Sequence, residues 1–85
     1  MNIEQLRSSI SQVDVIVHID ELLGEQGRQD IEYAIEQQYG VTQARFNEVR
    51  PHLMVVGYDP KQTNSSAILD RIRRQRVHAQ LIGGI

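Results

Sequence analysis

The stretch Val13–Asp20 reads VDVIVHID, and it decides the fold of the chain. It is rich in β-branched residues, which favour the extended backbone of a strand. One set of alternate positions is apolar throughout, and this pattern predicts a strand with one face in a hydrophobic core. The apolar positions are Val13, Val15, Val17 and Ile19, and they alternate with Asp14, Ile16, His18 and Asp20.

Helices and strands alternate along the rest of the chain. A glycine-punctuated loop at Leu22–Gly27 precedes a helix whose apolar residues recur at helical spacing. Gly40 is placed to end that helix in the left-handed conformation, and Asn64, Ser65 and Ser66 can cap a second helix. The predicted elements are a helix at Asp30–Tyr39, strands at Val41–Asn47 and Leu53–Tyr58, a helix at Ala67–Arg76 and a strand at Val77–Ile82.

This order of elements predicts a single α+β domain at residues 13–85. Strand-helix-strand-strand-helix-strand is the order of a ferredoxin-like βαββαβ two-layer sandwich. Its antiparallel four-stranded sheet is expected to have the strand order 4-1-3-2. Residues 1–12 are expected to form an N-terminal arm or a short helix. A chain of 85 residues has room for one such domain.

Composition excludes several classes of function. The chain has no cysteine, so disulfides, thiolate metal ligands and cysteine nucleophiles are excluded. A formal net charge of −2 argues against nucleic acid as a partner. No apolar run approaches the roughly 20 residues of a membrane span, and the first residues lack the pattern of a signal peptide. We therefore expect a cytoplasmic protein with no membrane span.

Charge is divided unevenly along the chain. Residues 1–40 carry eight acidic and two basic side chains, a net charge of −6. Residues 41–85 carry three acidic and seven basic side chains, a net charge of +4. Solvated helix faces of opposite sign would account for this division. This is the favoured interpretation, and the alternative is a polar molecule that associates head to tail or docks on a charged partner.

Three short phrases carry a resemblance to a known family. They are IEYAI at Ile31–Ile35 followed by YGV at Tyr39–Val41, then VGYDP at Val56–Pro60, and VHA at Val77–Ala79. With these phrases at this spacing, residues 13–82 resemble the heavy-metal-associated domain family. That family includes copper chaperones and the N-terminal modules of metal-pumping ATPases. The resemblance implies the same ferredoxin-like fold.

The metal-binding motif of that family is missing from this chain. In the family the first loop carries Met-x-Cys-x-x-Cys, whose two thiolates hold Cu(I) or another soft metal. Counting back from the first helix places Leu22 at the methionine position and Gly24 and Gly27 at the two cysteine positions. Neither glycine offers a ligand. The resemblance therefore does not imply Cu(I) binding by thiolates here.

A second interpretation of this loop is anion binding. Gly24, Gly27 and Arg28 precede a helix N-terminus, where backbone amides and a guanidinium could hold a phosphate or a carboxylate. Glu25 and Asp30 would compete for the same amides and repel an anion. The alternative is a turn that needs flexible glycines and binds nothing.

Strand alternation assigns side chains to the two faces of the sheet. The residues expected to face the helices are Val15, Val17, Ile19, Met54, Val56, Tyr58, Val77, Ala79 and Leu81. The three histidines are the remaining candidate ligands for a transition metal. His18 and His78 are expected near each other on the open face, since strands 1 and 4 are neighbours. Leu53 and Val55 would flank His18, and His52 lies in the turn at the same end.

The open face is therefore predicted to be apolar for a solvated surface, because Ile16, Leu53, Val55 and Ile82 surround the histidines. Monomers rarely leave such a patch bare. It could be the interface of a homodimer or partner protein, a platform where histidines coordinate haem or a metal, or a face partly covered by residues 1–12. Haem fits it better than zinc, because zinc prefers three or four protein ligands and haem needs one or two.

No pattern indicates an enzyme or an RNA-binding protein. The sequence shows no nucleophile with a neighbouring base, and it lacks the strand aromatics on which RNA bases stack. We therefore expect a non-enzymatic binding or carrier module that holds haem or a transition metal through His18, His78 and His52, beside Leu53 and Val55. The alternative is a protein-interaction or dimerisation module that uses the same face and binds no metal.

Overall fold

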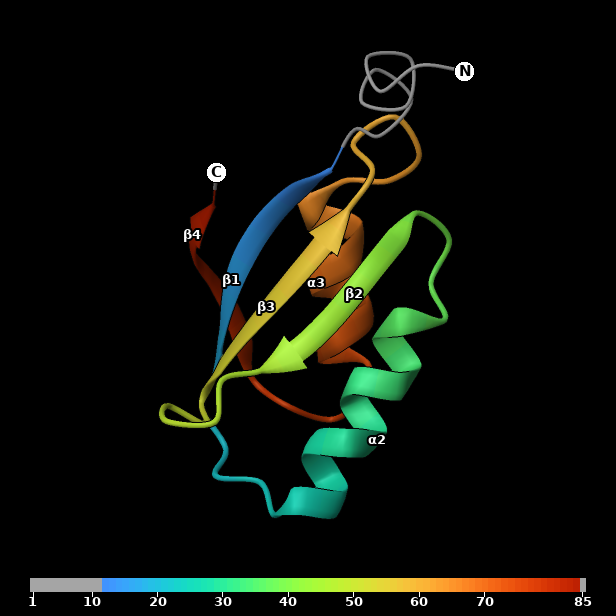
Figure 1. Ribbon diagram of the computed structural model, residues 1–85. Helices are drawn as coiled ribbons and strands as arrows, with labels where there is room; N and C mark the ends of the chain where they lie inside the picture. The colour runs from blue at the N-terminus through green and yellow to red at the C-terminus, as the bar shows by residue number, and fades with distance from the viewer. Residues whose placement is uncertain (1–11, 85) are drawn as a thin grey trace, which may run out of the picture.

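The computed structural model describes residues 12–84. Its elements form the predicted βαββαβ order (Figure 1). The expectation of an arm or short helix at residues 1–12 falls, except for Gln12, outside the described residues. The elements are β1 (Val13–Ile19), α2 (Glu25–Glu36), β2 (Val41–Phe46), β3 (Leu53–Tyr58), α3 (Ser65–Arg73) and β4 (Ala79–Gly84).

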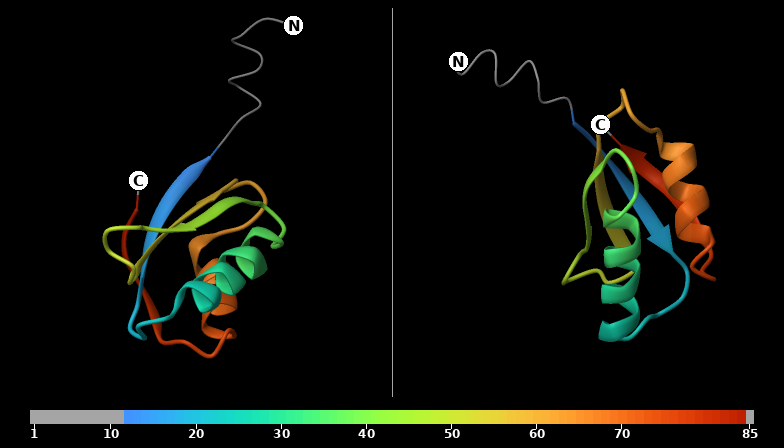
Figure 2. Two further views of the ribbon diagram at one scale, coloured as in Figure 1. Left: turned by 60° about the horizontal axis from the view of Figure 1, so that its bottom comes forward. Right: turned by 90° about the vertical axis from the view of Figure 1, so that its right-hand side faces the viewer.

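The four strands form one antiparallel sheet in the order β2-β3-β1-β4. This is the predicted order 4-1-3-2, counted from the opposite edge. The central strand β1 pairs with β3 from Val13–Tyr58 to His18–Leu53. Both helices cover the same face of the sheet and leave the other face open (Figure 2). The fold is thus the predicted two-layer ferredoxin-like sandwich.

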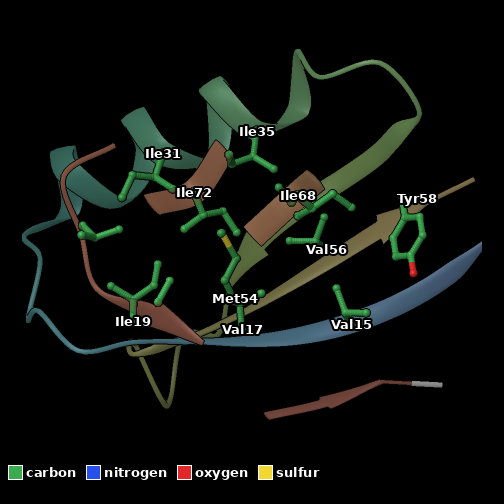
Figure 3. Packing of buried hydrophobic residues seen from close by; sticks show 13 residues of the cluster. Val15, Val17, Ile19, Ile31, Ile35, Met54, Val56, Tyr58, Ile68 and Ile72 are labelled. Carbon is green, nitrogen blue, oxygen red and sulfur yellow. The ribbon is translucent and has the colours of Figure 1, made fainter. Parts of the chain in front are cut away.

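The hydrophobic core lies between the sheet and the two helices (Figure 3). Val17 and Ile19 of β1, with Met54 and Val56 of β3, have no exposed surface. Burial of an aliphatic side chain of this size stabilises a fold by roughly 1.5–3 kcal/mol. The alternation predicted for these two strands is confirmed. The helices contribute Ile31, Ile35, Ile68 and Ile72 to the same cluster.

The predicted bounds of the first helix are wrong at both ends. Helix α2 begins at Glu25 instead of Asp30 and ends at Glu36 instead of Tyr39. Its first turn contains Gly27, which had been assigned to a loop. Glycine costs about 1 kcal/mol in a helix, and burial of Ile31 and Ile35 outweighs that cost. A Cβ at Gly27 would make only an ordinary 3.5 Å contact, so nothing in the packing demands a glycine there.

Gly40 turns the chain from α2 into β2. Its φ of +85° lies in the left-handed region, as predicted. The glycine lies four residues beyond the helix end, because the segment after Glu36 forms a separate turn. The Gly40 carbonyl accepts a hydrogen bond from Asp59 N at 2.8 Å, which fixes the start of β2 beside the end of β3.

The C-terminal elements also differ in their bounds from the prediction. Helix α3 starts at Ser65, with the Asn64 side chain accepting a hydrogen bond from Ala67 N at 2.8 Å, and it ends at Arg73 instead of Arg76. Strand β4 begins at Ala79, two residues later than predicted. Leu81 lies opposite the buried Val17, so it is on the helix-facing side of the sheet as predicted, although 38% of it is exposed because β4 is an edge strand. The pairing of β4 with β1 shifts register only beyond Leu81.

Candidate functional site

The open face of the sheet carries an apolar strip made of Ile16, Leu53 and Val55. In the β1–β3 register Ile16 lies opposite Val55 and His18 lies opposite Leu53, so the strip runs directly toward His18. All three apolar residues are half-buried. Ile82, on β4, is 54% exposed. The predicted apolar patch therefore exists, with its central members partly covered by their neighbours.

A polar bridge closes the far end of this strip. Gln12 Nε2 donates to Asp14 Oδ1 at 3.1 Å, and Thr42 Oγ1 donates to Gln12 Oε1 at 2.9 Å. The bridge spans from β1 to β2 across Gly57 of β3. A Cβ at Gly57 would lie 2.6 Å from Gln12 Nε2, so this close approach requires glycine. The strip is therefore bounded by polar groups at one end and by histidines at the other.

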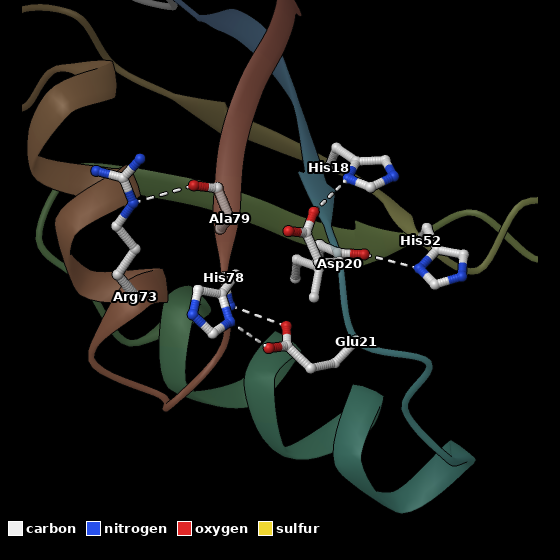
Figure 4. Close-up of polar contacts among 8 residues, drawn as sticks. His18, Asp20, Glu21, His52, Arg73, His78 and Ala79 are labelled. Atoms are coloured by element: carbon white, nitrogen blue, oxygen red, sulfur yellow. Dashed lines mark hydrogen bonds and ion pairs between the residues drawn. The ribbon is translucent and has the colours of Figure 1, made fainter.

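His18 and His52 stack at the other end of the strip (Figure 4). Their ring centroids are 5.6 Å apart and their planes differ by 12°. His18 is the last residue of β1 that pairs with β3. His52 precedes β3 and is held beside β1 through its backbone, because Ile19 N donates to the His52 carbonyl at 2.8 Å. The turn before β3 therefore places the imidazole of His52 beside that of His18.

Both rings have their Nδ1 atom engaged by the protein. His52 Nδ1 lies 2.7 Å from the Ile19 carbonyl oxygen, which can only accept, so Nδ1 carries the proton. His18 Nδ1 lies 3.1 Å from Asp20 Oδ1, and an ionised carboxylate also only accepts. In each neutral ring the remaining nitrogen, Nε2, then keeps its lone pair. The pair is partly solvated, since 35% of the His18 side chain is exposed.

His78 lies against Glu21 and not against His18 (Figure 4). Its ring Nδ1 is 2.6 Å from Glu21 Oε2, and its backbone N–H donates to Glu21 Oε1 at 2.8 Å. The hydrogen bond between the side chains raises the pKa of His78 and lowers the pKa of Glu21. The two side chains form an ion pair when His78 is protonated, and their hydrogen bonds tie the β1–α2 loop to the segment before β4.

The strand register explains which histidines meet. His18 is opposite Gln80 in the β1–β4 pair, and Asp20 N donates to the His78 carbonyl at 2.9 Å. His78 is therefore two residues before Gln80, the position facing His18, and lies beside Asp20 instead. Alternation predicted the face of His18 but not this offset. The signal that could have found His52 is its place directly before Leu53, the residue that pairs with His18.

The proposed anion-binding loop is mostly helix. Gly24 is the residue before α2, Gly27 lies in its first turn, and Arg28 donates from its guanidinium to the Leu23 carbonyl. Arg28 also lines a groove of about 630 Å³ between α2 and the end of β2. Three carboxylates line the same groove, and they oppose the binding of an anion there. They belong to Glu25, Glu32 and Glu48.

The donor set at the histidine pair is small. Within residues 12–84, no three side chains of His, Cys, Asp or Glu gather closely enough to hold a metal ion. A metal at the pair would thus have two protein ligands and open positions for water or a partner's ligand. In the same described part of the chain, neither helix has the length and apolar character needed to cross a membrane.

The fold is that of small copper-binding domains of known structure. One is a copper-binding domain from HMA7, a P-type ATPase, with a TM-score of 0.78 and 17% identity over 85% of this chain and 96% of that one. Another is the N-terminal domain of a potential copper-translocating P-type ATPase from Bacillus subtilis, with a TM-score of 0.77 and 19% identity over 87% and 91%. A third is the CopZ metallochaperone, with a TM-score of 0.68 and 22% identity over 81% and 98%.

Sequence comparisons add nothing to this likeness. No protein-family model matches the chain, and no curated protein matches it. The resemblance seen in the short phrases is thus supported at the level of the fold, where the solved domains of copper ATPases and a metallochaperone align with most of the chain.

Proposed function

We propose that this chain is a non-catalytic binding module that holds a divalent transition-metal ion through Nε2 of His18 and His52. The observation that carries the proposal is the stacked pair itself, in which each Nδ1 is engaged by a protein acceptor. Such anchoring fixes the tautomer in which Nε2 can donate its lone pair to a metal. Solved domains with the same fold are named as copper-binding domains and a metallochaperone, and this supports a binding role.

The chemistry of the donors selects the class of metal. Two neutral imidazoles suit Cu(II), Ni(II) and Zn(II), and the usual order of divalent affinities puts Cu(II) highest. Two protein ligands leave the ion with exchangeable positions, which a carrier needs in order to pass it on. Binding is therefore expected to be weaker than at a closed structural site with four protein ligands.

Asp20 acts on the metal through His18. Its carboxylate holds His18 Nδ1 at 3.1 Å and makes the imidazole a stronger donor. Loss of such an outer partner typically lowers metal affinity by about 10- to 100-fold. Asp20→Asn is therefore expected to weaken binding while leaving both ligands in place. Glu21→Gln is its matched control, because Glu21 engages His78 instead.

The stacked geometry favours a free ion over haem. Two nearly parallel rings side by side cannot lie on opposite faces of one porphyrin, so one histidine at most could ligate the iron axially. Leu53 and Val55 could then contact the ring from the apolar strip. Haem is accordingly a second probe beside the free ion.

Calorimetric titration with Cu(II), Ni(II) and Zn(II), and absorbance titration with haemin, test the proposal near pH 7.5, where free imidazoles are neutral. Wild type is expected to bind one ion per chain. His18→Ala and His52→Ala are each expected to lose at least about tenfold in affinity. His78→Ala is the matched control and should bind like wild type. No binding by wild type, or a loss confined to His78→Ala, would overturn the proposal.

The apolar strip favours a second candidate function, which is docking of a partner protein on the open face. Ile16, Leu53 and Val55 form one continuous surface along β1 and β3. In that case Val55→Lys would dissociate a complex and the histidine variants would leave it intact. Chemical shift mapping with a captured partner would place the contact on β3. Absence of metal binding together with this result would support docking in place of metal binding.

A further inference from the structure

The outer edge of β4 is exposed backbone at the end of the sheet. Within residues 12–84, strand β4 pairs with β1 on one side and with no strand on the other. Burial falls off sharply along the strand, since Ala79 is buried and all its residues from Gln80 to Gly84 are exposed. Figure 1 shows β4 at the border of the sheet, beside β1. It is a row of backbone groups available to a further strand.

The direction of these backbone groups follows from two contacts. The His78 carbonyl points toward β1, where it accepts from Asp20 N at 2.9 Å. The Ala79 carbonyl points the other way, where it accepts from Arg73 Nε at 3.0 Å. Since the direction alternates along a strand, the N–H and C=O of Leu81 also point to the outer edge. Arg73 covers only the first of these groups.

The side chains of β4 offer none of the usual protection of an edge. Its sequence, AQLIGG, contains no charged residue and no proline. Leu81 and Ile82 are 38% and 54% exposed. Natural edges are generally protected by charges, prolines, covering elements or bulges. Here only the register shift near Leu81 interrupts the strand.

The opposite edge of the sheet, strand β2, is protected by a side chain of α2. Glu32 of α2 accepts from Phe46 N at 2.8 Å, so a carboxylate occupies the position that a neighbouring strand's carbonyl would take. Strand β2 also carries Arg45. The β2 edge thus has a carboxylate of α2 on one of its groups and an arginine of its own, whereas β4 carries no charged residue and has the Arg73 side chain on its Ala79 carbonyl. The contrast marks the β4 edge as an interaction surface.

We propose that the β4 edge pairs with the β4 edge of a second copy of this chain, antiparallel and about a two-fold axis. In a two-fold interface the same surface of each copy contacts that surface of the other copy, so its residues must be compatible with each other in charge and shape. An uncharged strand does so without repulsion, and Leu81 and Ile82 of each copy would cover those of the other. Antiparallel pairing also places the two Arg73 side chains, each of which reaches from α3 to Ala79 at the start of β4, at opposite ends of the interface.

This dimer leaves the His18–His52 pair and the apolar strip of the open face outside the contact. It is therefore independent of the proposed metal binding, which can fail without affecting it. The result would be a continuous eight-stranded sheet with the helices of both copies on one side. A dimer through the open face would instead bury Val55, and the two arrangements are separable by mutation.

Sedimentation velocity from about 10 µM to 1 mM tests the proposal on the full chain. Wild type is expected to shift toward dimer with concentration, and Leu81→Lys to remain monomer throughout. Val49→Lys is the matched control: it changes a residue that is 86% exposed, in the turn before β3, and should dimerise like wild type. Circular dichroism establishes that each variant is folded, and Ile82→Lys serves as a second variant.

Amide hydrogen exchange gives an independent measurement. Exchange at the Leu81 N–H should slow as the protein concentration rises, while exchange in the β2 edge should not change. The proposal is overturned if wild type stays monomeric at 1 mM, or if Leu81→Lys dimerises like wild type. It is equally overturned if Leu81 is protected to the same extent at every concentration, since a segment of the same chain would then cover the edge.

Discussion

Replacing Gly40 with alanine should be among the most damaging small changes in this protein. Gly40 has a φ of +85°, and the left-handed conformation costs a residue with a Cβ about 1–2 kcal/mol. The added Cβ would lie 2.9 Å from Thr63 Cγ2 and 3.0 Å from Gln62 Cβ, closer than such atoms normally approach. Overpacking of this kind costs about 1–3 kcal/mol. The smaller entropy of the unfolded chain offsets about 0.4–1 kcal/mol.

The expected net loss is therefore about 1–4.5 kcal/mol in the free energy of unfolding. Urea denaturation followed by circular dichroism measures it, with an unchanged slope showing that the unfolded state is the same. Gly24→Ala is the matched control, since Gly24 has a φ of −71° and open space around its Cβ position. That variant should stay within about 1 kcal/mol of wild type. Equal losses at both glycines would show that the left-handed conformation and close contacts of Gly40 do not control stability.

Three further predictions concern a cap, the core and an ion pair. Asn64→Ala should cost about 1 kcal/mol, because Ala67 N loses its side-chain acceptor; thermal unfolding measures the loss. Ile35→Ala should cost about 2–5 kcal/mol, because the side chain has no exposed surface and leaves a cavity, and urea unfolding measures it. The Glu21–His78 pair should stabilise the fold most between about pH 4.5 and 6.5, the ordinary pKa values of the two groups. Its contribution should fade as the pH rises through the raised pKa of His78, and as it falls through the lowered pKa of Glu21, and Glu21→Gln should remove both changes from a stability–pH profile.

The strands at the centre of the sheet were the most predictable part of the fold. Val13–Ile19 and Leu53–Tyr58 carry a strong alternation with one buried face, so local pattern and tertiary packing agree. The predicted start of α2 was wrong because Gly27 indicates a loop when only propensity is weighed. The helix is stabilised by burial of Ile31 and Ile35, and this burial depends on contacts with residues that are distant in sequence.

The candidate site was predicted only in part. Alternation placed His18 on the open face, and its apolar neighbours Leu53 and Val55 lie there as expected. The partner ring could not be chosen, because stacking of His52 depends on the turn before β3 and on two hydrogen bonds to Ile19. Likewise, the Glu21–His78 pair depends on the register between β1 and β4, which alternation alone does not fix.

Imidazole nitrogen NMR on wild type, with and without Zn(II), tests whether His18 and His52 form the metal site. We expect that His18 and His52, once neutral, both carry their proton on Nδ1, as their contacts with Asp20 and Ile19 require. Zn(II) should then shift Nε2 of both rings together at one ion per chain, with His78 unaffected. Protons on Nε2 in the free protein, or a zinc response at His78 alone, would contradict this expectation.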